Sequence, residues 1–140
     1  MFKVRVIALL FLLALNLGAC KKAIRDQKEK YVLGVMTTGR WFLDYYAVNG
    51  VDSTADFKAY EFQFYDDSRI EAISTSGSQG GTWSGNPSTL TMTIQFQPSQ
   101  DPNLTRISYP WLFTESHIGL VFAETTTTFG KIVIRLKKKA

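Results

Sequence analysis

One segment of the chain alternates strictly between polar and apolar side chains. Residues 89–97 read Thr-Leu-Thr-Met-Thr-Ile-Gln-Phe-Gln, and this period of two is typical of a β-strand with one buried face. Shorter segments of the same kind recur from residue 39 onward. Turn-forming stretches such as Asn49-Gly50 and Asp66-Asp67-Ser68 separate them. The sequence therefore predicts an all-β domain with tight connections.

Eight strands are expected in this domain, which spans residues 39–140. They lie at residues 41–45, 60–64, 69–74, 81–84, 89–97, 107–115, 118–122 and 129–137. Short connections favour an antiparallel up-and-down arrangement, and such a sheet loses both exposed edges when it closes on itself. We expect an eight-stranded antiparallel barrel. A short helix should precede it within residues 20–38, where helix formers are common and proline is absent.

An eight-stranded barrel is just wide enough to be filled by its own side chains or to hold one small ligand. Trp41, Leu43 and Tyr45 are expected to share the inner face of the first strand. The side chains predicted to line a pocket for a small hydrophobic or amphipathic ligand are Tyr45, Tyr60, Phe62, Met92 and Trp111. The alternative is that they are ordinary core. The filled barrel would then act through its outer surface, as an accessory subunit or inhibitor of a membrane complex.

The sequence does not predict an enzyme. His117 is the only histidine, and its neighbour Ser116 is expected on the opposite face of the strand, so no catalytic pair is indicated. Asp66 and Asp67 are interpreted as turn formers rather than as an acid pair. No set of ligands at useful spacing indicates a metal site, and no cofactor is expected.

The N-terminus has the layout of a secretory signal. Lys3 and Arg5 precede an apolar run over residues 6–15, which is too short to span a bilayer as a stable helix. Small residues follow, directly before the single cysteine of the chain. Residues 1–19 are therefore predicted to be a signal peptide.

The four residues Leu17-Gly18-Ala19-Cys20 resemble the lipobox of bacterial lipoproteins. The resemblance implies that Cys20 receives a diacylglycerol, that the signal is removed just before it, and that residues 20–38 form a lipidated tether with a short helix. It places the protein in the bacterial cell envelope, anchored to a membrane, with the outer membrane expected. The alternative is a cysteine that follows an ordinary signal peptide by chance.

Removal of the signal peptide changes the charge and the cysteine chemistry of the chain. The full sequence has 16 Lys and Arg against 12 Asp and Glu. Losing Lys3 and Arg5 leaves 14 against 12, a net charge of +2 that does not call for a nucleic-acid partner. With Cys20 lipidated, no thiol remains for a disulfide, so burial of apolar surface must stabilise the fold. The sequence leaves the identity of any protein partner unknown.

The start of the first strand, Gly39-Arg40-Trp41, resembles the Gly-x-Trp motif of lipocalins. The order of landmarks over residues 36–137 is similar to that of small lipocalin-like lipoproteins of Bacteroidetes-type bacteria. The resemblance implies a lipocalin-like barrel that binds a small hydrophobic ligand or lipid. It also implies that a basic residue of the last strand covers Trp41. Arg135 is the candidate, although its position in the strand alternation points it away from the apolar face.

Overall fold

The computed structural model describes residues 21–24, 27, 30–31, 33–98 and 101–140. The strands are β1 (Trp41–Val48), β2 (Val51–Asp52), β3 (Glu61–Phe64), β4 (Arg69–Ser74), β5 (Gly77–Asn86), β6 (Thr91–Phe96), β7 (Pro110–His117), β8 (Leu120–Thr127) and β9 (Gly130–Lys138). A 3-10 helix, η1 (Thr54–Phe57), and a short helix, α2 (Pro102–Thr105), lie in the connections. Residues 21–24, 27, 30–31 and 33–37 are also helical. The predicted signal peptide and Cys20 lie outside the described residues.

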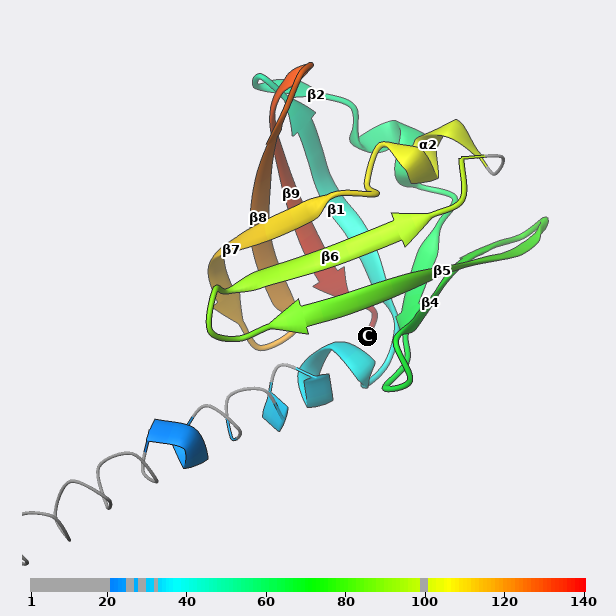
Figure 1. Cartoon of the computed structure of the whole chain (residues 1–140). Helices are drawn as coiled ribbons and strands as arrows, with labels where there is room; N and C mark the ends of the chain where they lie inside the picture. Colours follow the sequence, from blue (N-terminus) through cyan, green and yellow to red (C-terminus); the bar gives the residue numbers. More distant parts are fainter. Residues whose placement is uncertain (1–20, 25–26, 28–29, 32, 99–100) are drawn as a thin grey trace, which may run out of the picture.

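Eight strands form a closed antiparallel barrel (Figure 1). The order is β1-β3-β4-β5-β6-β7-β8-β9, and β9 returns to pair with β1 from Trp41↔Lys138 to Val48↔Ile132. The two-residue strand β2 adds only to the end of β1. The predicted all-β, eight-stranded up-and-down barrel with a short helix before it is therefore confirmed.

A β-bulge in β1 changes which side chains face inward. Leu43 pairs with Leu136, but Tyr45 pairs with Arg135, so Asp44 is the extra residue. Beyond the bulge, Tyr46 is buried and Tyr45 is only partly buried. The expectation that Tyr45 shares the inner face with Trp41 and Leu43 is wrong, because one inserted residue reverses the alternation.

Two other strand boundaries differ from the sequence pattern. β6 begins at Thr91, because Leu90 lies in the preceding turn with a positive φ of 53° and is exposed. β7 begins at Pro110 rather than near residue 107. The chain before it forms α2, whose first turn is capped by Asp101 accepting a hydrogen bond from the Asn103 backbone N–H at 2.8 Å. Pro110 stands at the first position of its strand, where its missing N–H is tolerated.

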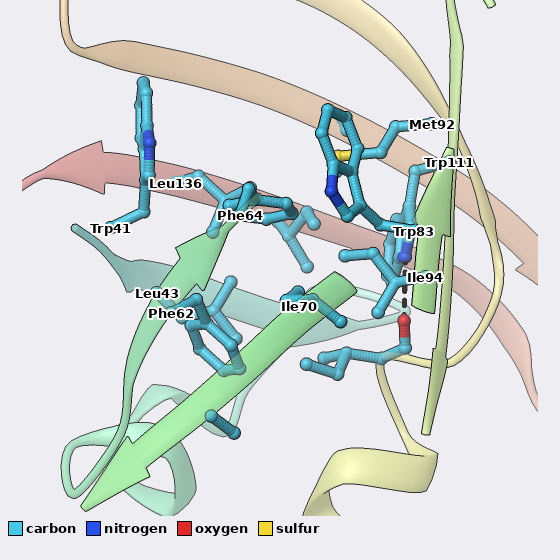
Figure 2. Close-up of a cluster of buried hydrophobic side chains, with 14 of the residues drawn as sticks. Trp41, Leu43, Phe62, Phe64, Ile70, Trp83, Met92, Ile94, Trp111 and Leu136 are labelled. Atoms are coloured by element: carbon cyan, nitrogen blue, oxygen red, sulfur yellow. Dashed lines mark hydrogen bonds between the residues drawn. The ribbon is translucent and has the colours of Figure 1, made fainter. Parts of the chain in front are cut away.

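The interior of the barrel is filled with apolar side chains (Figure 2). Phe62, Met92 and Trp111 retain 1%, 0% and 0% of their accessible surface. A side chain that lines a void large enough for water keeps accessible surface on that side, so these three have no ligand-sized space beside them. Burial of the apolar interior as a whole is the main stabilising contribution to this fold, whose described part has no disulfide.

The helical residues 33–37 close one end of the barrel. Met36 is buried, and its carbonyl accepts a hydrogen bond from Trp41 Nε1 at 3.0 Å. The cation over the Trp41 ring is Lys138, with Nζ 6.0 Å from the ring centroid. The predicted pairing of Arg135 with Trp41 is therefore wrong. Arg135 points outward, as its alternation indicated, and pairs with Asp44 at 2.7 Å.

Gly81 allows close packing between β5 and β6, and this generates a prediction. A Cβ at this position would lie 2.5 Å from the Gln95 carbonyl oxygen and 2.8 Å from the Phe96 ring. Gly81→Ala should therefore lower the free energy of unfolding by about 1–3 kcal/mol, measured by chemical denaturation. Gly80→Ala is the matched control, since a Cβ there meets no atom within 4 Å. Equal stability of the two variants would contradict this packing.

Candidate functional site

A hollow lies at the end of the barrel opposite the helical residues 33–37. We call it the rim hollow; it has a volume of about 350 Å³. It is bounded by the ends of β1 and β9, the turn before β9, and α2 with the residues after it. The side chains that define it are Tyr46, Val48, Arg106, Tyr109, Phe129 and Ile132.

The apolar floor and the aromatic lip of the rim hollow come from different elements. Ile132 of β9 is buried, and Val48 of β1 packs partly buried against the core. Phe129, in the turn between β8 and β9, is 78% exposed. A large aromatic side chain that projects from a turn beside buried aliphatic groups gives the hollow an apolar surface open to solvent.

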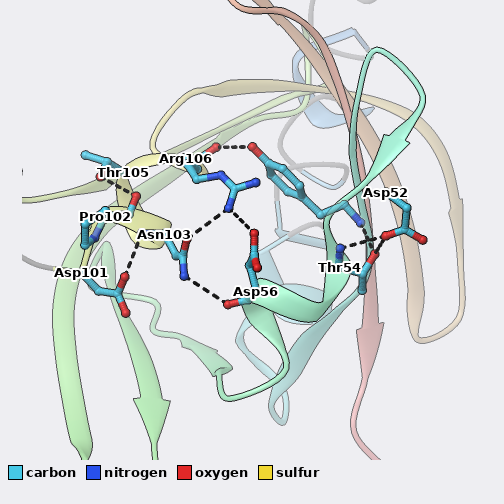
Figure 3. A network of polar contacts seen from close by, with 9 residues as sticks. Asp52, Thr54, Asp56, Asp101, Pro102, Asn103, Thr105 and Arg106 are labelled. Carbon is cyan, nitrogen blue, oxygen red and sulfur yellow. Dashed lines mark hydrogen bonds and ion pairs between the residues drawn. The ribbon is translucent and has the colours of Figure 1, made fainter.

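Arg106 holds the elements around the rim hollow together (Figure 3). Its Nη1 lies 2.7 Å from Asp56 Oδ2 in η1 and 3.1 Å from Asn103 Oδ1 in α2. Its guanidinium carbon is 4.8 Å from the centroid of the Tyr46 ring. The Tyr46 hydroxyl in turn donates to the Arg106 carbonyl oxygen at 3.2 Å. These contacts fix η1, α2 and β1 relative to one another.

The charges of this network follow from its geometry. Burial raises the pKa of Tyr46 above its usual value, although the nearby Arg106 guanidinium opposes this. Partial burial is the largest single effect on Arg106 and disfavours its charged form, but the interactions with Asp56 and Tyr46 together outweigh burial, and the pKa of Arg106 is raised. The rim hollow therefore presents a neutral phenol and a permanently charged guanidinium to any bound molecule.

A second turn supports the same end of β1. The Thr54 backbone N–H donates to Asp52 Oδ1 at 2.8 Å, and the Tyr46 backbone N–H donates to Thr54 Oγ1 at 2.9 Å. The hydrogen bonds from Thr54 lower the pKa of the Asp52 carboxyl. This turn fixes the backbone of Tyr46 just after the bulge, and so fixes the side of the rim hollow that β1 provides.

None of the five sequence-predicted ligand residues lines the rim hollow. Phe62, Met92 and Trp111 are in the filled interior, while Tyr45 is on the outer wall beneath Arg135. Tyr60 is buried, and its hydroxyl donates to Asp101 at the start of α2. The ligand-binding role of these residues stays a prediction.

Sequence reasoning missed the residues that form the rim hollow. The sequence does indicate that Phe129 is unusual, because it is a lone aromatic residue between a run of threonines and Gly130. Tyr46 was hidden by the bulge at Asp44. Arg106 reaches Asp56 across fifty residues of sequence, a contact that local pattern does not reveal.

His117 is the last residue of β7 and is exposed. It contacts Glu115, two residues earlier on the same face of β7, and both side chains are more than half exposed. Within the described ranges, no three His, Cys, Asp or Glu side chains gather as a metal site requires. None of the described helical stretches has the length and apolar character needed to cross a bilayer.

Comparisons with known proteins bear on the fold. No protein-family model matches the chain, and no curated protein matches it. Among solved structures, the chain is similar to the crystal structure of a DUF4847 family protein from Bacteroides vulgatus ATCC 8482. The match has a TM-score of 0.57 and 13% sequence identity, and it covers 78% of this chain and 99% of that chain. The likeness therefore supports the barrel fold.

The Tyr60–Asp101 contact yields a prediction about pH. Burial and the hydrogen bond to Asp101 raise the pKa of Tyr60 to about 12. Because the ordinary value is 10, the unfolded chain loses this proton first, and the stability that the neutral phenol provides falls as pH rises from 10 to 12. Tyr60→Phe should lose about 1 kcal/mol at neutral pH and show a smaller decline over that range. Urea denaturation at several pH values measures both. Parallel pH profiles for the two proteins would contradict this role of Tyr60.

Proposed function

We propose that the protein is a lipid-anchored bacterial envelope protein that binds a small amphipathic molecule, or the apolar end of an envelope lipid, in the rim hollow. The observation that carries the binding proposal is the rim hollow itself. Its volume of about 350 Å³ lies within the range of small-molecule sites, and its lining is mainly aromatic and aliphatic. The proposed activity is binding rather than catalysis.

The filled interior supports a site at the rim rather than at the barrel centre. Because Phe62 and Trp111 pack without residual surface, a ligand placed between them would have to displace core side chains. At the rim, an apolar group can contact Phe129 and Ile132 without such a rearrangement. Its polar end would lie beside Arg106, whose Nη1 is already paired with Asp56.

The anchor in this proposal is the lipid on Cys20. Its support is the order of basic residues, apolar run and Leu17-Gly18-Ala19-Cys20 in the sequence. Each buried acyl methylene contributes about 0.8 kcal/mol, so two or three chains hold a protein on a membrane stably. The lipocalin resemblance of Gly39-Arg40-Trp41 is consistent with a barrel that carries its ligand site at the open end.

Phe129 provides the test of ligand binding. The mature polypeptide, residues 20–140 with Cys20→Ser, is titrated with an anilinonaphthalene sulfonate dye, which joins an apolar ring system to an anionic group. Phe129→Ser should weaken dye binding at least fivefold, because it removes the lip of the rim hollow. Phe129 is already 78% exposed, so stability should change little.

Val51→Ser is the matched control for this titration. Val51 is 68% exposed at the same end of the barrel but outside the rim hollow, so its dye affinity should equal that of the parent. Equal affinity in all three proteins would contradict binding in the rim hollow.

Cys20 provides the test of the anchor. The full chain, produced in a bacterium that processes lipoproteins, should incorporate labelled palmitate and lose residues 1–19 by mass. Cys20→Ser should abolish both, because the thiol is the atom that receives the lipid, while Lys21→Ser should change neither. Palmitate incorporation that persists in Cys20→Ser would refute the lipobox interpretation.

A second candidate function has its own observation. Leu90, in the turn before β6, and Leu112, on β7, are both exposed, and Leu112 pairs with Thr91 next to Leu90, so the two lie close together. A filled barrel with such a patch suits an accessory subunit or inhibitor of an envelope complex. Absence of dye binding in the parent protein would favour this candidate.

A further inference from the structure

Exposed apolar side chains gather at the barrel end that the N-terminal segment approaches. Ile118, in the turn between β7 and β8, is fully exposed, and Tyr31 is 68% exposed. The Lys138 backbone N–H donates to the Gly119 carbonyl oxygen at 2.8 Å, so this turn lies beside the end of β9. Figure 1 shows the helical residues and the C-terminus at this same end. We call it the tether end.

A groove of about 430 Å³ separates the helical residues from the turn at the tether end. One wall comes from the helical segment and the other from the barrel. Each wall combines a lysine with an apolar or aromatic side chain. The helical wall contributes Lys30, Tyr31 and Val35, and the barrel wall contributes His117, Ile118 and Lys138. Such a groove matches a molecule with an anionic head and an apolar tail.

The tether end carries lysines that the described ion pairs leave without a partner. Lys30, Lys137 and Lys138 have no carboxylate partner among the described ion pairs. The carboxylate of Glu61, at the same end, is already shared by two other cations. These lysines are therefore available to an anionic surface, and Lys138 is also the one whose Nζ lies 6.0 Å from the Trp41 ring centroid.

The opposite end of the barrel differs in charge. Asp52, Asp56 and Asp101 lie there, around η1 and α2, and Arg106 is paired with Asp56. Val51 and Phe129 are exposed at that end too, so apolar exposure alone does not distinguish the two ends. Lys58 at that end also has no partner among the described ion pairs, so the tether end differs in the number of such lysines, which are Lys30, Lys137 and Lys138.

We propose that the tether end docks on an anionic phospholipid membrane. Ile118 inserts at the boundary between the headgroups and the acyl chains, and a lipid phosphate lies in the groove between Lys30 and Lys138. This orientation of the barrel on the membrane rests on the proposed function, in which Cys20 carries the lipid anchor. The chain runs from Cys20 through residues 21–38 to the tether end. Docking leaves the rim hollow on the side that faces away from the membrane.

The test uses the full lipidated chain, processed as in the cell and reconstituted in vesicles that contain phosphatidylglycerol. An environment-sensitive fluorophore is attached through Ile118→Cys, or through Val51→Cys as the matched control at the other end. Iodide should quench the label at 118 at least threefold less than the label at 51, and emission at 118 should shift to the blue.

The contribution of positive charge to docking is tested by one charge-reversal substitution at each end of the barrel. Lys137→Glu should reduce the protection of the label at 118, and vesicles of phosphatidylcholine alone should do the same. Lys58→Glu, on the connection after η1, should leave that protection unchanged. Equal iodide quenching at 118 and 51 in phosphatidylglycerol vesicles would overturn the docking proposal.

The experiment distinguishes a failure to attach lipid to Cys20 from a failure of the tether end to dock. Cys20 is the only native cysteine, so a lipidated Ile118→Cys chain takes up one fluorophore and an unlipidated chain takes up two. Mass spectrometry gives this number. The contrast between labels at 118 and 51 decides docking in either case, because any label on Cys20 is common to both variants.

Discussion

Antiparallel pairing between β1 and β9 closes the barrel, and the buried interior depends on that closure. The pairing runs the full length of β1, across the bulge at Asp44, and places Leu43 against Leu136 and Tyr46 against Ile134. Without it, two long strands would expose their backbone groups as sheet edges and the aromatic core would face water. The chain must make this contact across about ninety residues of sequence, with no disulfide in the described structure to help it.

Closure also explains why the two ends of the barrel differ. At one end, the helical residues 33–37 and Lys138 cover Trp41, so the core is sealed there. At the other end, α2 and η1 stand beside the opening and are held by the Arg106–Asp56 pair. The middle is filled with side chains, so the chemistry available to a partner or ligand lies at the ends and on the outer wall.

The sequence predicts the architecture well because strand alternation and turn residues are local signals. The pattern of residues 89–97 places Met92, Ile94 and Phe96 correctly in the interior. It does not predict the bulge at Asp44, because a bulge depends on pairing with β9. It places Leu90 on the wrong side for a similar reason, since the turn from β5 to β6 takes that residue into the left-handed region.

The candidate site was harder to predict than the fold. Arg106 and Phe129 meet at the rim hollow only after the whole barrel has closed, and neither belongs to an alternating pattern. Composition could indicate that aromatic side chains fill or line a barrel, but it could not decide between the two. That outcome depends on packing among side chains such as Phe62 and Trp111 from strands that are distant in sequence.

Native-state hydrogen exchange along β1 and β9 tests the closed barrel most directly. If the two strands seal the sheet, their paired amides exchange only through global unfolding, with the same free energy of opening as those of β4 and β5. If β1 or β9 instead exchanges through local opening at much lower free energy, as free edges do, the barrel is not closed and this account of its filled interior fails.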